Sequence, residues 1–235
     1  MRFDISAFTH KGTKRENNQD CILANGVVLN SGTIKFESQD TLCCFVADGV
    51  GGNNAGDFAS DYILQKIVIE LADIIKTPLE TLKRINTNLI ETTAADPAKR
   101  GAASTLSGLI VDKDFFKVIH AGDSELWLLR FDSFMKITND QVLNTKHENS
   151  PITSYFGGKE DCLKLDEGIV LEDSIEGDLF VICSDGLFKT MSEDQLKEIL
   201  LQNMSLKIKT EKILELCLLQ GADDNVSVVL ILNKS

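Results

Sequence analysis

The chain of 235 residues is 43% apolar, which allows one large domain or two small ones around a sizeable core. Its formal net charge of −12 excludes nucleic acid and anionic membranes as general partners, because both require a basic surface. No apolar run approaches the ~20 residues of a membrane span, no signal peptide opens the chain and no linker divides it, so we expect one cytoplasmic domain over residues 1–235.

The beginning of the chain predicts a strand, a polar loop and a hairpin. Residues 2–10 roughly alternate in polarity and predict a strand, and residues 21–36 predict a hairpin around residues 30–32. The polar segment between them contains Arg15 and Asp20. A guanidinium binds phosphate oxygens well, although on this segment alone a solvated surface arginine is the simpler interpretation.

The most distinctive stretch is an apolar strand, residues 42–47, that ends abruptly on Asp48 and is followed by glycines at positions 49, 51 and 52. Glycine lets the backbone come close to a ligand or to another segment, because it has no Cβ. Taken alone, Asp48 is equally well explained as a turn residue that makes local hydrogen bonds.

Helical spacing of apolar residues predicts two long helices after this turn. The first covers residues 55–76, and the second runs to about residue 95, with Thr77 as its N-cap and Pro78 in its first turn. Two such helices side by side would cover one face of a sheet.

The second half of the chain predicts mainly antiparallel strands, because the turns between several of them are short. Strands are predicted over residues 104–111, 115–121, 125–131, 134–138, 168–173, 178–183 and 226–232. Residues 150–158 predict a short helical turn closed by glycine. Further helices are predicted after Ser192 and over about residues 206–219.

The cysteines and histidines do not predict a zinc site or a disulfide framework. The six cysteines include no Cys-x-x-Cys pair, and the three histidines show no ligand spacing. Cys43, Cys44 and Cys183 lie inside apolar strand-like runs. We therefore expect them to be buried, small apolar side chains in a reducing environment.

Four aspartates lie at the ends of strongly apolar strands: Asp48, Asp123, Asp185 and Asp224. Packed strands can bring such ends to one rim, where the carboxylates would repel one another unless cations neutralised them. Oxygen ligands suit Mg²⁺ or Mn²⁺, and two such ions sharing one carboxylate activate water and bind a phosphoryl group. Each aspartate separately is more simply a turn residue, but together with Arg15 the set favours metal-assisted hydrolysis of a phosphate ester.

An ordered series of short motifs runs through nearly the whole chain. The motifs are Gly12-x-x-Arg15-x-Asn17-Asn18-Gln19-Asp20, Val46-Ala47-Asp48-Gly49-Val50-Gly51-Gly52, Gly56-Asp57-x-Ala59-Ser60, Ala103-Ser104-Thr105, His120-Ala121-Gly122-Asp123-Ser124, Thr138-x-Asp140, Ile152-Thr153-x-x-x-Gly157, Ser184-Asp185-Gly186-Leu187 and Asp224-Asn225-x-Ser227. In this order they resemble the type 2C, metal-dependent serine/threonine protein phosphatases of bacterial type. The resemblance implies an α+β fold, a four-layer αββα sandwich in which helices flank two antiparallel sheets.

The resemblance also implies roles for the site residues. Asp48 would bridge two Mg²⁺ or Mn²⁺ ions, the carbonyl of Gly49 would bind the second ion, and Asp185 and Asp224 would hold the first. Asp123 would hold a third, more weakly bound ion.

Two further residues would act on the substrate and the water. Arg15 would bind the substrate phosphate, and Asp20 would act through metal-bound water. A water that bridges the ions would attack the phosphorus of phosphoserine or phosphothreonine in line, without a covalent intermediate. A phosphoprotein and a cognate kinase would be the partners in signal transduction, and we expect a monomer that binds neither nucleic acid nor membranes.

The sequence departs from the family pattern without losing an expected metal ligand. Glu125 replaces a usual arginine, Gln141 a usual histidine and Ala103 a usual glycine. Only eleven residues separate Asp140 from Ile152, where the family places a longer flap beside the active site. We expect a more open site, in which the acidic surface favours phosphosites with flanking basic residues.

Three alternatives remain open. The chain could be a dedicated regulatory phosphatase for one partner, or a pseudophosphatase that binds a phosphoprotein without turnover. The presence of Asp48, Asp185 and Asp224 argues against the pseudophosphatase. A nucleotide hydrolase is less well supported, because the sequence has no phosphate-binding loop.

Overall fold

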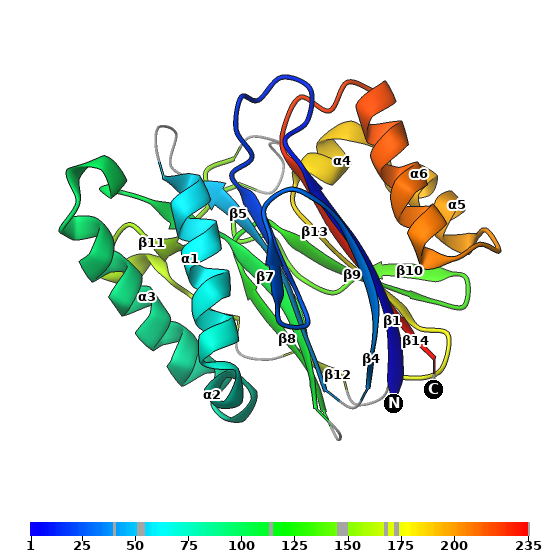
Figure 1. The fold of residues 1–235 in the computed structure, drawn as a ribbon, viewed down its shortest axis with the longest axis horizontal. Coiled ribbons are helices and arrows are strands. Elements are labelled where there is room, and N and C mark those ends of the chain that lie inside the picture. The colour runs from blue at the N-terminus through cyan, green and yellow to red at the C-terminus, as the bar shows by residue number, and fades with distance from the viewer. Residues whose placement is uncertain are drawn as a thin grey trace.

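The computed structural model describes residues 1–39, 41–50, 55–112, 115–144, 150–166, 169–171 and 174–234. Within these residues the strands form two antiparallel sheets that pack face to face, and helices cover the outer face of each sheet (Figure 1). This arrangement confirms the predicted four-layer αββα sandwich of the α+β class.

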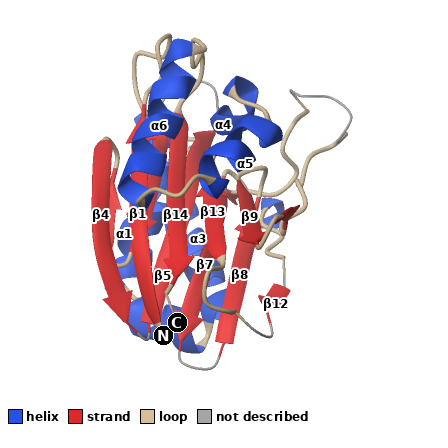
Figure 2. Cartoon of the chain, turned by 90° about the vertical axis from the view of Figure 1, so that its right-hand side faces the viewer, coloured by secondary structure: helices blue, strands red, loops and turns tan. Residues whose placement is uncertain are grey.

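Several neighbouring strands in each sheet come from distant parts of the sequence (Figure 2). One sheet contains, in spatial order among the described residues, β10 (Ser133–Lys136), β9 (Glu125–Arg130), β13 (Leu179–Cys183), β14 (Val226–Asn233), β1 (Arg2–His10) and β4 (Gly32–Gln39). The other contains β11 (Phe156–Gly157), β6 (Ala103–Ser104), β5 (Thr41–Val50), β7 (Leu106–Asp112), β8 (Phe115–Ala121) and β12 (Ile169–Leu171), with β2 (Asp20–Ala24) beside β5 and β3 (Val27–Leu29) beside β2.

The helices form the two outer layers. They are α1 (Gly56–Ile69), α2 (Leu71–Lys76), α3 (Pro78–Ala94), α4 (Gly186–Thr190), α5 (Glu193–Leu201) and α6 (Leu206–Leu219), with short 3₁₀ helices η1 (Pro97–Lys99) and η2 (Glu160–Cys162). None of the helices described here is both long enough and apolar enough to cross a membrane.

The position of strand β5 between two packed layers explains why its sequence is continuously apolar. Its alternate side chains Cys43 and Phe45 pack with α1 and α3, whereas Cys44 and Val46 pack in the core between the sheets. Successive side chains of a strand point to opposite faces, so a strand in an inner layer must be apolar on both. Each such burial stabilises the fold by about 1.5–3 kcal/mol.

The second outer layer is built in the same way on β13. Phe180 and Ile182 lie in the core between the sheets, whereas Val181 and Cys183 pack under α4, α5 and α6. The predicted burial of the strand cysteines is confirmed, and all six cysteines are free thiols.

The predicted hairpin around residues 30–32 is wrong. The hairpin in this region joins β2 to β3 through Asn25 and Gly26, whose φ angles of 44° and 93° suit a tight two-residue turn. Residues 30–31 instead carry the chain from β3 in one sheet to β4 in the other. The Asn-Gly pair is the sequence signal for the observed turn.

The predicted helical turn over residues 150–158 is also wrong, because Phe156 and Gly157 form β11, which pairs with β6. Gly157 has a φ of 82°, and a Cβ on it would lie 2.2 Å from the carbonyl oxygen of Ala102. Glycine is therefore needed here for the close approach of two strands.

The two predicted long helices have different outcomes. The helix predicted over residues 55–76 is interrupted at Glu70, which separates α1 from α2. The second helix, α3, does begin at Pro78 with Thr77 as its N-cap residue, as predicted, but Thr77 makes no side-chain capping hydrogen bond, and its hydroxyl is directed to the carbonyl oxygen of Asp73 at 3.4 Å. The glycines at positions 51 and 52, and the ends of the strand predicted over residues 168–173, lie outside the described residues.

Candidate active site

The strand ends that carry the predicted aspartates meet at one edge of the sandwich. Asp20 at the start of β2 is in register with Asp48 near the end of β5. Asp185 lies two residues after β13, and Asp224 lies two residues before β14, the antiparallel neighbour of β13. Asp123 lies in the turn between β8 and β9. Antiparallel pairing therefore places one strand's end beside the next strand's start, and the carboxylates gather there.

A cleft of about 730 Å³ opens between these strand ends. Its lining includes every residue predicted to bind metal or phosphate, namely Arg15, Asp48, Gly49, Asp123, Asp185 and Asp224. Asp20 is 1% exposed and lies outside that lining. The fold therefore brings together residues that lie far apart along the sequence.

Asp20 is held by two hydroxyl groups. Ser184 and Ser227 each donate a hydrogen bond to its Oδ2 at 2.7 Å. Burial raises the pKa of Asp20 to about 6, even though the two serine hydrogen bonds act to lower it. Its other oxygen, Oδ1, is buried and has no hydrogen-bond partner among the described residues.

Asp48 and Asp123 are the most strongly perturbed carboxyl groups of the cleft. Burial raises the pKa of Asp48 well above its usual range, and the charges of four neighbouring aspartates raise it further. Burial, with Asp185 nearby, raises the pKa of Asp123 to about 7. Oδ1 of Asp123 is also buried without a partner in the part of the chain that the structure describes.

These groups fit hard divalent cations. Buried carboxylate oxygens normally have donors, because leaving them unpaired costs free energy. A cluster made only of oxygen atoms, with raised pKa values and unpaired oxygens, is the ligand chemistry that Mg²⁺ and Mn²⁺ prefer. Within the described residues, no three acidic, histidine or cysteine side chains are already arranged around one ion position.

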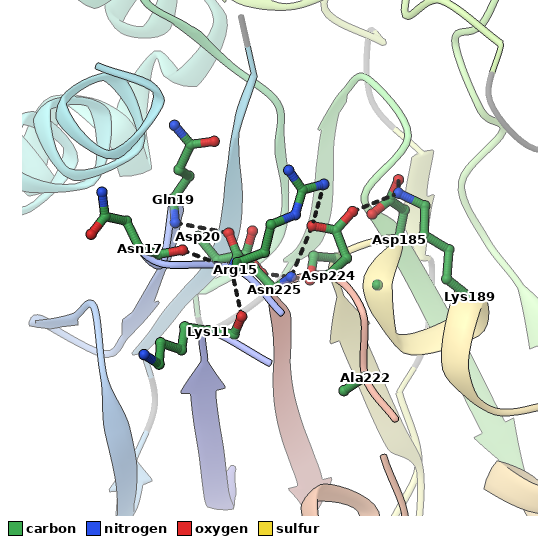
Figure 3. Close-up of polar contacts among 12 residues, drawn as sticks. Lys11, Arg15, Asn17, Gln19, Asp20, Asp185, Lys189, Ala222, Asp224 and Asn225 are labelled. Carbon is green, nitrogen blue, oxygen red and sulfur yellow. Dashed lines mark hydrogen bonds and ion pairs between the residues drawn. The ribbon is translucent and has the colours of Figure 1, made fainter. Parts of the chain in front are cut away.

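Asp185 and Asp224 are instead paired with cationic side chains (Figure 3). Nζ of Lys189 lies 2.6 Å from Oδ2 of Asp185 and 3.0 Å from Oδ2 of Asp224. Nη2 of Arg15 lies 2.9 Å from Oδ1 of Asp224. Burial raises the pKa of Asp185 despite Lys189. Burial acts in the same direction on Asp224, but Lys189 and Arg15 bring the pKa of Asp224 below its usual value.

Gly49 lies where β5 meets the first turn of α1. A Cβ on Gly49 would lie 2.3 Å from the carbonyl group of Gly56, so no side chain fits between the strand and the helix. The amide of Gly49 donates to the carbonyl oxygen of Gln19 at 3.1 Å, which ties the strand to the preceding loop. The residue type is therefore required by packing, in addition to any role of its carbonyl oxygen.

Asn225 anchors the loop that carries Arg15 (Figure 3). Its Oδ1 accepts a hydrogen bond from the amide of Gln19 at 2.9 Å. Its Nδ2 donates to the carbonyl oxygens of Lys11 at 3.0 Å and Asn17 at 3.1 Å. One side chain next to Asp224 therefore fixes both ends of the loop between β1 and β2.

Sequence reasoning gave no role to Lys189, Asn225, Ser184 or Ser227. A signal for Lys189 was present, because it follows Asp185 by four residues at the start of a helix, and such residues lie on one face. No sequence signal indicated that Asn225 would reach across to the loop between β1 and β2, which precedes it by more than two hundred residues.

The short segment after Asp140 borders the cleft. Its described ends pair through an isolated bridge between Val142 and Ile152, and the amide of Leu143 donates to the carbonyl oxygen of Pro151 at 2.9 Å. Ile152 contributes to the lining of the cleft.

A model of the family described as Protein phosphatase 2C matches residues 14–215. The chain is 27% identical over 252 residues to protein phosphatase PhpP of Streptococcus pneumoniae, covering 97% of this chain and 96% of the relative. It is also 27% identical over 249 residues to the serine/threonine phosphatase stp of Listeria monocytogenes, covering 95% and 93%.

Solved structures share the fold. The Streptococcus agalactiae serine/threonine phosphatase superposes with a TM-score of 0.83 at 24% identity, covering 99% of this chain and all of the other. The Mycobacterium tuberculosis serine/threonine phosphatase PstP/Ppp gives a TM-score of 0.81 at 23% identity, covering both chains completely.

Proposed function

The chain belongs to the protein phosphatase 2C family and is a protein serine/threonine phosphatase, and from this premise we propose that it hydrolyses phosphoserine and phosphothreonine in proteins with bound divalent metal ions. The observation that carries the metal-dependent mechanism is the meeting of Asp48, Asp123, Asp185 and Asp224 in one cleft. The buried oxygen of Asp123 that has no partner among the described residues supports it further.

The proposed ligands divide between two main ion positions. Asp48 would be shared by both ions, Asp185 and Asp224 would complete the first, and the carbonyl oxygen of Gly49 would contribute to the second. Asp123 would hold a third ion. Mg²⁺ or Mn²⁺, when bound, would supply a water of lowered pKa as the nucleophile and neutralise charge on the phosphoryl oxygens.

The protein's own groups would bind the phosphate and accept the proton. Arg15 lines the cleft and contacts Asp224 through Nη2, and its guanidinium carries five N–H donors for phosphate oxygens. Asp20 lies in register with Asp48 and would act through metal-bound water, and its Oδ1, which has no partner in the described part of the chain, is the atom we assign to accepting the proton of that water. Ser184 and Ser227 would keep its carboxyl group oriented.

The test is hydrolysis of an aryl phosphate and of a phosphothreonine peptide with Mn²⁺, with Mg²⁺ and with a chelator. We expect the wild type to require the ion, and we expect Asp48→Asn and Asp185→Asn each to lower kcat by about 100-fold or more. Asp223→Asn is the matched control, because Asp223 is exposed and pairs with Lys14. It removes the same charge beside Asp224 and should leave the rate nearly unchanged.

A wild type that is no faster with Mn²⁺ than Asp48→Asn would refute catalysis. Phosphopeptide binding without turnover would then support the pseudophosphatase, and turnover of a single phosphoprotein only would support the dedicated regulatory enzyme. A single domain over residues 1–235, a cytoplasmic location, a cognate kinase, signal transduction and a monomeric state stay predictions from the sequence.

A further inference from the structure

Lys189 contacts two of the proposed metal ligands at the same time. Its ammonium group lies between Asp185 and Asp224, 2.6 Å and 3.0 Å from one oxygen of each. These are the two carboxylates that the proposed function assigns to one ion, and Figure 3 shows the lysine side chain reaching both from α4. The contact with Asp185 arises from local geometry, since Lys189 follows Asp185 by four residues on the same helical face, whereas the contact with Asp224 joins α4 to the segment before β14.

The second oxygen of Asp224 is also engaged. Oδ1 of Asp224 accepts from Arg15 at 2.9 Å and from the amide of Asn225 at 2.9 Å. Both oxygens of Asp224 are therefore paired, in contrast to Asp20 and Asp123, which each keep an unpaired oxygen in the described part of the chain. A cation that binds Asp224 through Oδ2 has to displace Lys189.

An ion and the ammonium cannot share these oxygens without strong repulsion. A small divalent cation binds carboxylate oxygens at about 2.0–2.1 Å, so it would lie within a few ångströms of the ammonium nitrogen, where like charges repel. The side chain of Lys189 is 38% exposed, and its flexible stem can move into water.

We propose that Lys189 is a tethered cation that competes with the divalent metal ion for Asp185 and Asp224, and so sets the metal affinity of this site. The inference rests on the proposed function, because it requires an ion at these carboxylates. Without the ion, Lys189 stabilises the carboxylate cluster. With the ion, Lys189 is released.

The test measures binding of Mn²⁺ alone by titration calorimetry, at fixed pH and ionic strength, for wild type and Lys189→Met. We expect Lys189→Met to bind the ion about tenfold more tightly, because the wild type must break two partly exposed ion pairs that contribute roughly a factor of three each. Lys189→Arg keeps the charge and should bind close to wild type. Lys14→Met is the matched control, because Lys14 pairs with the exposed Asp223.

Thermal unfolding gives a second readout that does not depend on catalysis. Without metal, Lys189→Met should melt below the wild type, because the carboxylates lose their counter-ion. Saturating Mn²⁺ should raise its melting temperature more than that of the wild type, because tighter binding stabilises the folded state further. Lys189→Gln serves as a second neutral variant if the methionine variant folds poorly.

The outcomes separate this inference from the proposed function. Asp185→Asn should abolish or strongly weaken Mn²⁺ binding and thereby identifies the site that is titrated. Equal or weaker Mn²⁺ affinity of Lys189→Met, with Asp185→Asn impaired, would overturn the competition and leave the metal site standing. No Mn²⁺ binding by the wild type or by either neutral variant would overturn both.

Discussion

Gly49 illustrates how one residue serves both the fold and the site. Its backbone faces that of Gly56 so closely that a Cβ on either would collide with the other, at 2.3 Å and 2.8 Å respectively. This contact seats the first turn of α1 against the end of β5, next to Asp48. The packing reason is separate from the proposed use of the Gly49 carbonyl oxygen as a ligand.

Replacing Gly49 with alanine should therefore destabilise the protein by about 3 kcal/mol, because a well-packed backbone contact has to open. The displaced strand end should also lower phosphatase activity. Urea-induced unfolding and the aryl phosphate assay measure the two effects.

Gly101→Ala is the control for this substitution. Gly101 has a φ of 84°, but a Cβ on it would have no other atom within 4 Å among the described residues, so alanine there meets only backbone strain of about 1–2 kcal/mol. If Gly49→Ala is no less stable than Gly101→Ala, the steric argument is wrong.

At the scale of elements, the loop between β1 and β2 is held in place by the segment before β14. Asn225 makes three hydrogen bonds to this loop, and the amide of Thr13 donates to the carbonyl oxygen of Ala222 at 2.8 Å. The loop carries Arg15, so the position of the proposed phosphate-binding group depends on a segment near the other end of the chain.

Asn225→Ala should lower kcat/KM for a phosphothreonine peptide by about 100-fold, because Arg15 is no longer held at the cleft. We expect the loss to appear mainly as a higher KM, because Arg15 is proposed to bind the substrate phosphate. Asn18→Ala is the control on the same loop. Its side chain bonds Thr9, Asn30 and, at 3.3 Å, the amide of Asp20, and it makes none of the Asn225 contacts, so a loss as large as that of Asn225→Ala would contradict the anchoring role.

Elements with strong local signals were predicted well from the sequence. The apolar run that forms β5 and the capping sequence before α5 are signals that do not depend on distant residues. Ser192 and Gln195 do form a reciprocal capping box. The aspartates were found because each follows or precedes an apolar strand.

What the sequence could not reveal depends on contacts between distant segments. The strand β11 forms only because β6 lies beside it, so its two residues carry no strand pattern of their own. The crossing of residues 30–31 between sheets likewise depends on which strand β4 pairs with. The contact of Lys189 with Asp224 was missed for a similar reason, because it joins α4 to the segment before β14.

For the whole molecule, we expect the charge balance to favour particular substrates. The net charge of −12 gives a negative field around the cleft, and the positive groups described in that cleft, Arg15 and Lys189, are paired with Asp185 and Asp224. A field of this sign attracts basic peptides and repels acidic ones.

Phosphopeptides with flanking lysine or arginine should therefore show a kcat/KM about tenfold above that of peptides with flanking acidic residues at low salt. The difference should shrink as ionic strength rises toward about 1 M, where charges are screened within roughly 3 Å. A panel of peptides that differ only in flanking charge measures this. Equal rates across the panel at low salt would contradict the expectation.

The placement of β14 has a consequence for how the protein is made. This strand lies between β1 and β13 in the middle of its sheet. Strand β1 therefore pairs with a strand that is separated from it by almost the whole sequence. Such distant pairing makes folding slow. Asp224 and Asn225 immediately precede the same strand. A growing chain on the ribosome can therefore complete neither this sheet nor the proposed site until β14 has emerged, so we expect unfinished chains to be inactive.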